Sequence, residues 1–98
     1  MEQALRAIAN ARRRAMLELV WDHELGASEI ARLSRLSKPA ASQHLRVLRD
    51  AGLVRVRVAG NQRFYRSDPV RVDELRAALD AFWGDRLDRM RAEVEAGR

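Results

Sequence analysis

The sequence predicts a mainly helical fold with one two-stranded β-hairpin, and three observations predict it. In the first and last thirds of the chain, apolar residues recur at spacings of three and four, the period of an amphipathic helix. Between them, Val54, Val56 and Val58 alternate with arginines, the period of a half-buried strand. The length of 98 residues, 47% of them hydrophobic, suits a small globular domain. We therefore expect a single domain over residues 1–98.

Three short helices are expected before the middle of the chain. Leu5 and Ile8 mark the first helix by their spacing, and Asn10 is placed to cap the second. A brief third helix that contains Ile30 should follow Gly26.

A fourth helix is expected to begin after Ser37, whose hydroxyl can cap its first turn. Pro39 suits that turn because its missing N–H would have no partner there. Gly52 suits the stop, since glycine tolerates the left-handed conformation. The buried stripe of this helix is Ala41, Leu45 and Leu48. Helix, tight turn and helix make a helix-turn-helix unit over about residues 27–51, in which the second helix reads DNA.

A hairpin is expected over about residues 53–67, and a long helix over about residues 70–95. Because a lone hairpin is only marginally stable, the valines and one of Phe64 or Tyr65 should pack on the helices. The final helix follows an Asp-Pro pair and carries apolar residues at helical spacing for about six turns. A helix-turn-helix followed by a basic hairpin is the layout of a DNA-binding winged helix-turn-helix.

Positive charge is concentrated in this part of the chain. Residues 31–66 hold nine Arg or Lys and one acid, a net charge of +8, whereas the remainder is −3 and the whole chain is +5. Such a concentration is typical of a surface that binds a polyanion. The alternative is chance clustering, since 18 of the 98 residues are arginine.

The fourth helix turns five side chains outward when its apolar stripe faces the core. Lys38 and Arg46 can donate to phosphate or guanine, and Gln43 can pair with adenine. Ser42 can contact base or phosphate, and Pro39 can contact a thymine methyl. The hairpin residues expected at phosphate or in the minor groove are Arg57, Asn61, Gln62 and Arg63. The alternatives are a solvated helix face and weak ion pairs on the surface.

His44 lies between this outward face and the buried stripe. We interpret it as a histidine that is hydrogen-bonded at the edge of the core. A contact with a DNA base is the alternative.

Other classes of function find little support. The chain has no cysteine, which excludes disulfides and thiolate metal sites. It has no run of 18 apolar residues and no apolar N-terminal region, so we expect a cytoplasmic protein without a membrane segment. No Gly-rich phosphate loop and no nucleophile-histidine-acid set indicates an enzyme.

Residues 37–69 resemble the signature of the ArsR-type bacterial winged-helix repressors. The likeness lies in the runs Ser-Gln-His-Leu at 42–45 and Ala-Gly-Leu-Val at 51–54, with Leu48 and Tyr65, and it extends to the first and last helices. The resemblance implies a homodimer that represses transcription from a near-palindromic operator in double-stranded DNA. It also implies base contacts by Lys38, Pro39, Ser42 and Gln43, with the tip of the wing at about residues 60–63.

In that family the dimer is built largely from the first and last helices. The surplus of apolar residues in the last helix agrees, although these residues could equally cover the domain's own core. The expected interface residues are Leu5, Ile8, Leu75, Leu79, Phe82, Trp83, Leu87 and Met90.

The chain departs from the family pattern in two places. Metal-sensing members carry Cys-x-Cys where this chain has Gly-Ala-Ser at 26–28, or histidine-containing ligand sets in the last helix, which here has no histidine. We therefore expect no metal site and no cofactor. Arg35 stands in the turn where a glycine is common, so the conformation of the turn must suit a side chain.

Two questions stay open at this point. An inducer could be an organic ligand held between the end helices near Trp83, or there could be none. The competing interpretation of the whole chain is a winged-helix interaction module whose charge gives only unspecific nucleic-acid binding.

Overall fold

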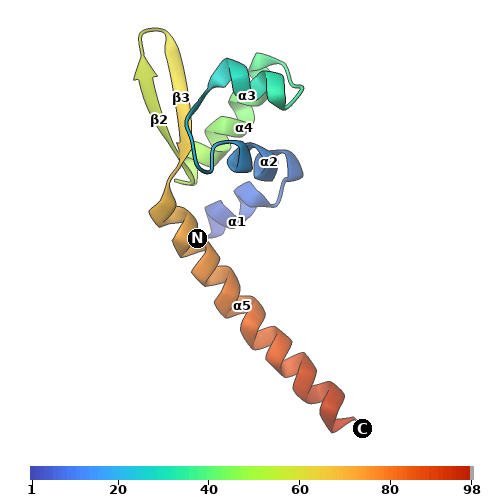
Figure 1. Ribbon diagram of the computed structural model, residues 1–98. Coiled ribbons are helices and arrows are strands. Elements are labelled where there is room, and N and C mark those ends of the chain that lie inside the picture. Colours follow the sequence, from blue (N-terminus) through green and yellow to red (C-terminus); the bar gives the residue numbers. More distant parts are fainter. Residues whose placement is uncertain (98) are drawn as a thin grey trace.

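The computed structural model of the chain describes residues 1–97, residue 85 by its backbone alone. Figure 1 shows the earlier helices and the β-hairpin gathered into one body, from which the last helix projects. The elements follow in the order α1 (Glu2–Ile8), α2 (Ala11–Leu19), β1 (Leu25–Gly26), α3 (Ala27–Leu33), α4 (Lys38–Asp50), β2 (Val54–Ala59), β3 (Gln62–Ser67) and α5 (Pro69–Ala96). The predicted mainly helical fold with a hairpin before the last helix is confirmed.

Side-chain caps set the starts of α2 and α4. The Asn10 side chain accepts hydrogen bonds from the backbone N–H groups of Arg12 and Arg13, at 2.9 and 3.1 Å. Ser37 Oγ accepts from the backbone N–H of Ala40 at 3.2 Å. Both caps are those that the sequence predicts, because a short polar side chain satisfies N–H groups that have no partner within the helix.

Two residues with positive φ shape the helix-turn-helix unit. Gly52, which follows the C-cap residue Ala51 of α4, has φ +79°, the left-handed conformation expected of it. Arg35, in the turn between α3 and α4, has φ +55°. A left-handed conformation costs a residue with a side chain about 1–2 kcal/mol, so the turn is held by the packing of its two helices.

The sheet has three strands in the order β1-β3-β2, all antiparallel. β2 and β3 form the predicted hairpin along their full length of six residues each. The prediction of two strands omits β1, which pairs Leu25 with Tyr65 and Gly26 with Phe64. Two residues are too few to show an alternating pattern in the sequence.

The core lies where α2, α3 and α4 meet the base of the hairpin. Leu45 and Leu48 of α4 have no exposed surface, and Tyr65 of β3 is buried, as expected. Val54 is buried as well, whereas Val58 is 64% exposed. The expectation that all three valines pack on the helices is therefore wrong at Val58, because the tip of the hairpin reaches beyond the body.

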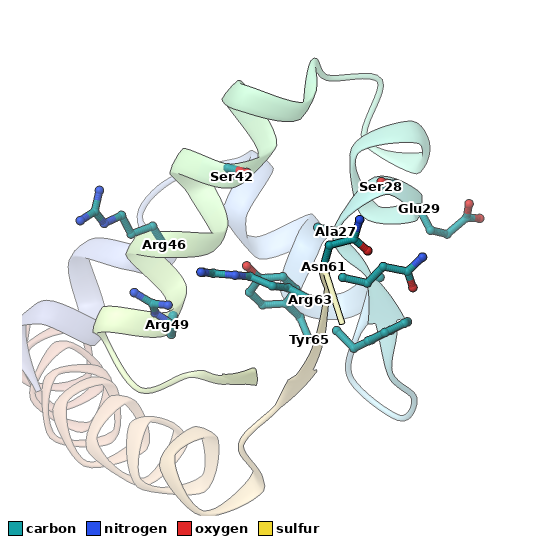
Figure 2. A pocket seen from close by; sticks show the side chains of 12 residues that line it. Ala27, Ser28, Glu29, Ser42, Arg46, Arg49, Asn61, Arg63 and Tyr65 are labelled. Carbon is teal, nitrogen blue, oxygen red and sulfur yellow. The ribbon is translucent and has the colours of Figure 1, made fainter. Parts of the chain in front are cut away.

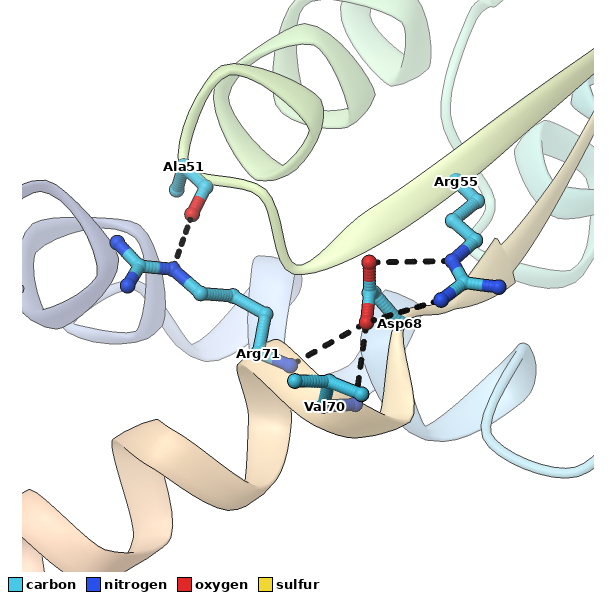
Figure 3. A network of polar contacts seen from close by, with 5 residues as sticks. All are labelled: Ala51, Arg55, Asp68, Val70 and Arg71. Atoms are coloured by element: carbon cyan, nitrogen blue, oxygen red, sulfur yellow. Dashed lines mark hydrogen bonds and ion pairs between the residues drawn. The ribbon is translucent and has the colours of Figure 1, made fainter.

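Polar contacts fix the first turn of α5 to the body (Figure 3). Asp68 Oδ1 accepts from the backbone N–H groups of Val70 and Arg71, at 3.1 and 3.2 Å, and so caps the helix. The Asp68 carboxylate also pairs with Arg55 of β2 at 3.1 Å. Arg71 Nε donates to the carbonyl oxygen of Ala51 at 3.1 Å. The start of α5 is thus tied both to the hairpin and to the end of α4.

Beyond its first turns α5 leaves the body. Val72, Leu75 and Leu79 pack against the core, and the apolar side chains further along the helix are exposed. Figure 1 shows this outer part extending away from the other elements. The molecule is consequently 63 Å long, although its other two dimensions are 26 and 21 Å.

Candidate nucleic-acid interface

The outward face of α4 carries the side chains that the sequence predicts for DNA reading. α4 buries Ala41, Leu45 and Leu48, and helix geometry turns its opposite side to solvent. All five predicted reading residues are exposed, and they are Lys38, Pro39, Ser42, Gln43 and Arg46.

A hollow of about 810 Å³ lies between α4, the first turn of α3 and the hairpin. Figure 2 shows Arg46 and Arg49 on α4, and Arg63 reaching from β3 toward that helix. The predicted residues that line this hollow are Ser42, Arg46, Asn61, Gln62 and Arg63. The structure thus brings the middle of α4 and the tip of the hairpin together around one concave surface. Lys38, Pro39, Gln43 and Arg57 lie outside its lining.

Three polar residues of this hollow were not singled out from the sequence, and they are Ser28, Glu29 and Arg49. Arg49 follows Ser42 and Arg46 at intervals of seven and three residues, a helical spacing that could have identified it. Ser28 comes from the first turn of α3. Nothing in the sequence links Ser28 to α4, because its position depends on how the two helices pack.

The basic side chains of residues 31–66 divide into paired and unpaired groups. Acids from elsewhere in the chain take up part of the charge, in the ion pairs Arg32–Glu29, Arg55–Asp68 and Arg57–Glu24. Within the described part of the chain, the basic residues of 31–66 without a carboxylate partner are Arg35, Lys38, Arg46, Arg63 and Arg66. Their charge is the part most available to a polyanion.

Arg57 differs from the other predicted contact residues. Its Nη2 lies 2.7 Å from Glu24 Oε1, and its Nε donates to the same carboxylate. The guanidinium also lies over the Phe64 ring, 4.6 Å from the ring centre. The hydrogen bond from Arg57 holds the pKa of Glu24 below its usual value. Arg57 therefore fastens the hairpin to the loop before β1, the surface pairing that the sequence left open.

His44 is half-buried at the edge of the core. Arg13 Nη1 of α2 lies 3.5 Å from His44 Nδ1. Burial lowers the pKa of His44, and the positive charges of Arg13 and Arg12 lower it further. The interpretation of His44 as a hydrogen-bonded histidine at the core edge agrees with this geometry.

The eight residues predicted for a dimer interface fall into two groups. Leu75 is only 5% exposed, and Ile8 and Leu79 are half-buried against the same core. These three pack on their own chain, which is the alternative that the sequence left open for Leu75 and Leu79 of the last helix. The other five are exposed on α1 and on the outer part of α5, and they are Leu5, Phe82, Trp83, Leu87 and Met90.

A second, smaller hollow of about 280 Å³ lies between α2 and the first half of α5. Leu17, Val72 and Leu79 contribute apolar surface to it, and Trp21 lies at its edge with half its surface exposed. Trp83, near which the sequence suggests a ligand, lines neither of the two hollows.

Neither a membrane-spanning helix nor a metal-binding cluster occurs in the described part of the chain. Among residues 1–97, no helix combines the length and the apolar character needed to cross a membrane. In the same part of the chain, no three His, Asp or Glu residues gather in a way that could hold a metal ion.

Comparisons with known proteins point to one family. The profile of the bacterial regulatory proteins of the arsR family matches residues 10–56. The HTH-type transcriptional regulator Rv2034 of Mycobacterium tuberculosis is 44% identical over 82 residues, which cover 84% of this chain and 77% of the relative. This chain belongs to the arsR family.

Solved structures agree with the arsR-family assignment. A crystal structure of a possible transcriptional regulator for arsenical resistance matches with a TM-score of 0.81 and 41% identity, over 95% of this chain and 96% of that one. A homodimeric winged helix-turn-helix DNA-binding domain from Mycobacterium bovis matches with a TM-score of 0.70 and 28% identity, over 86% and 78% of the two chains. The arsR-family regulator is thus a winged helix-turn-helix protein, as the sequence predicts. α3 and α4 are the helices that lie in the range predicted for the helix-turn-helix, and β2 and β3 are the strands in the range predicted for the wing.

Proposed function

We propose that this arsR-family regulator is a homodimeric, metal-independent repressor that binds a near-palindromic operator in double-stranded DNA. The observation that carries the proposal is the concave surface between α4 and the wing, which combines exposed hydrogen-bond donors with unpaired cations. An α-helix fits the major groove of B-DNA, and a basic wing can reach the neighbouring backbone or minor groove. As part of this proposal we assign the protein to the cytoplasm, where the chromosomal DNA of a bacterium lies. DNA binding by itself requires no catalytic activity, so we assign none.

We assign base reading to the exposed face of α4, part of which lies outside this concave surface, and backbone contact to the wing tip. Lys38 and Gln43 lie in the first half of α4, the part of a recognition helix that contacts base edges. Arg57 is assigned to holding the wing in place through Glu24. The residues assigned to phosphate or minor-groove contact are Asn61, Gln62 and Arg63, with Arg46 and Arg49 beside them on α4.

The proposed dimer is supported by the exposed apolar residues of outer α5. Trp83, Leu87 and Met90 follow one another at helical spacing and are each more than half exposed. Phe82 packs edge to face on Trp83, with ring centres 5.3 Å apart, and enlarges this surface. Fully burying one such side chain contributes about 1.5–3 kcal/mol. Two copies that bury these residues would present two α4 helices to half-sites about one helical turn apart, ~10 bp.

The test uses the purified full chain and fragmented DNA from the organism that encodes it. Fragments that stay bound at about physiological salt are sequenced, and the affinity for a selected duplex is compared with that for its shuffled version. We expect the selected duplex to bind ~10³–10⁷ times more tightly. If the selected and the shuffled duplex bind with equal affinity at several salt concentrations, the proposed function is wrong. The alternative, an interaction module with unspecific nucleic-acid binding, would then be favoured.

Salt dependence measures the phosphate contacts separately. If each protomer contacts three to five phosphates, the dimer should lose about 10³–10⁵ in affinity between about 50 and 200 mM salt. A flat salt dependence would contradict the proposed basic contact surface.

Two substitutions distinguish base reading from backbone contact. Gln43→Ala should cost ~1–3 kcal/mol at one operator position and relax base preference there, whereas Arg63→Ala should weaken all sequences alike and reduce the salt slope by about 1. Arg91→Ala, at the far end of α5, is the control and should change neither quantity. If neither Gln43→Ala nor Arg63→Ala affects binding, α4 and the wing are not the contact surface.

Repression and metal independence have their own measurements. A reporter gene behind the selected operator should be expressed more strongly when the regulator is deleted. A reporter that falls instead would identify an activator. Operator affinity should be the same with a chelator as with added zinc, and a change of tenfold or more would contradict metal independence.

A further inference from the structure

The Arg13 side chain joins the N-terminal helix to the recognition helix. Its Nε donates to the carbonyl oxygen of Ala7 at 2.6 Å, and its Nη2 donates to that of Arg6 at 3.1 Å. Its Nη1 faces His44 Nδ1 at 3.5 Å. One guanidinium therefore contacts the last turn of α1 and the middle of α4 at the same time.

The chemistry of the pair fixes the form of His44. An arginine side chain only donates hydrogen bonds, so Nδ1 of His44 must accept. The ring is then neutral and carries its proton on Nε2. His44 follows Gln43, so a shift of this ring would move the backbone next to a proposed base-reading residue.

Arg14 provides an internal comparison. Its Nη1 donates to the carbonyl oxygen of Ile8 at 2.7 Å, so it also stabilises the end of α1. Among the described hydrogen bonds of Arg14, none reaches α4. Both arginines donate hydrogen bonds to the end of α1. Of the two, only Arg13 also contacts α4, through His44.

We propose that Arg13 is a positioning residue for DNA recognition, which sets the orientation of α4 relative to α1 through His44. The inference rests on the proposed function, because α1 is part of the proposed dimer interface. In a dimer held by α1 and α5, the angle between α1 and α4 determines how far apart the two reading helices lie. Arg13 would thereby determine which half-site spacing the repressor prefers.

The expected effect is moderate and specific. Residues that couple two sites without touching a ligand change the coupling by about 0.5–2 kcal/mol, which corresponds to about 2- to 30-fold in affinity. The loss should appear in the affinity for the selected operator and not in the affinity for a shuffled duplex. Operators with the half-sites one base pair closer or further apart should be discriminated less well.

The experiment compares Arg13→Gln with Arg14→Gln in the full chain. Each variant is measured on the selected operator, on the two spacing variants and on the shuffled duplex, together with its thermal unfolding. Both variants should unfold at a lower temperature, because both lose hydrogen bonds to the end of α1. Only Arg13→Gln should lose operator affinity and spacing preference.

Variants of His44 test the same contact without touching the caps of α1. His44→Asn keeps an acceptor at the position of Nδ1, whereas His44→Leu removes it at similar volume. We expect His44→Leu to reproduce the binding defect of Arg13→Gln and His44→Asn to retain most of the spacing preference. Combining Arg13→Gln with His44→Leu should add little to either single change.

The outcomes separate this inference from the proposed function. If Arg13→Gln behaves like Arg14→Gln in DNA binding, or if His44→Leu keeps the spacing preference, the positioning role is wrong. Should Gln43→Ala and Arg63→Ala still weaken binding in that case, the proposed function stands. If those two variants also leave binding unchanged, the proposed function is wrong, and the positioning role of Arg13, which rests on it, is wrong as well.

Discussion

The two halves of α5 have the same apolar periodicity and opposite surroundings. In the first half, Leu75 is buried and Leu79 is half-buried against the core of their own chain. In the second half, Trp83, Leu87 and Met90 continue the same spacing and are exposed. A helical repeat therefore tells which face of a helix is apolar, and only the tertiary structure tells whether the same chain covers that face.

The contacts along α5 change at the same place. Its start is held by the Asp68 cap and by the hydrogen bond from Arg71 to the end of α4. Arg76 then pairs with Asp73 and Asp80 on the helix surface, an arrangement that stabilises the helix itself and does not attach it to the body. The outer half is thus a formed helix with an uncovered apolar face, which a second copy would cover.

The largest expected effect comes from placing a charge in the uncovered face. Trp83→Glu should convert the proposed dimer into a monomer, because a carboxylate would have to be buried without a partner. Binding to an operator with two half-sites should then weaken by about 10²–10⁴-fold, the contribution of linking two binding modules. Sedimentation equilibrium and a binding titration measure the two quantities.

Ala92→Glu is the matched control for that charge. Position 92 lies nine residues after Trp83, about two and a half helical turns, and so on the opposite side of the helix. Ala92→Glu should leave both the molar mass of the protein in solution and its affinity for the operator unchanged. Equal effects of the two substitutions would show that outer α5 has no preferred interface side.

The next effect contrasts the two halves directly. Leu75→Ala should lower the free energy of unfolding by about 2–5 kcal/mol, because it leaves a cavity in the core. Leu87→Ala should change the stability of the protomer by no more than about 0.5 kcal/mol, as expected of an exposed site. Both are measured by urea unfolding in the Trp83→Glu background, so that association does not contribute. Similar losses at the two positions would mean that outer α5 also packs on its own chain.

A smaller effect concerns the junction between α5 and the body. Asp68→Ala should cost about 0.5–2 kcal/mol, since it removes a helix cap. The Arg55 side chain, with the backbone N–H groups of Arg71 and Val70, holds the pKa of Asp68 below its usual value. This stabilisation is therefore complete above the ordinary aspartate pKa of about 3.9 and is lost as pH falls through the lower pKa of the folded state.

Thermal unfolding between about pH 7 and pH 3 measures this contribution. The wild type and Asp68→Ala should differ most at neutral pH and converge in acid. Asp88→Ala, on the exposed outer half of α5, should track the wild type throughout. A difference at Asp68 that stays constant down to about pH 3 would contradict the charge-based account.

The smallest expected effect is the contribution of His44, on α4, to the pH dependence of stability. The pKa of His44 is lower in the folded state, so the unfolded chain takes up its proton first as pH falls. Stability from this group is complete above about pH 6.5 and decreases as pH falls toward the folded pKa. Thermal unfolding from about pH 7.5 to 5 should show this decrease in the wild type and a smaller one in His44→Leu. The same slope in both proteins would exclude His44 as its source.

Signals from residues close together in the sequence were enough to predict the helices and where they begin and end. Asn10, Ser37 and Gly52 act at fixed offsets from the turns they shape, and the alternation of valines with arginines marks β2. The outward face of α4 followed from its buried stripe.

What the sequence could not provide depends on elements that meet only in three dimensions. β1 becomes a strand because β3 lies beside it. Arg57 is paired because Glu24 is brought across to the wing, 33 positions away in the sequence. The Arg13–His44 contact likewise joins residues 31 positions apart.

The central claim is that outer α5 is covered by a second copy while α4 and the wing read DNA. The most direct test is the molar mass of the purified protein, by light scattering, alone and bound to the selected operator duplex. We predict the mass of two chains in solution at micromolar concentration and two chains per duplex in the complex. A single chain in solution, and one chain bound per operator at saturation, would contradict the account.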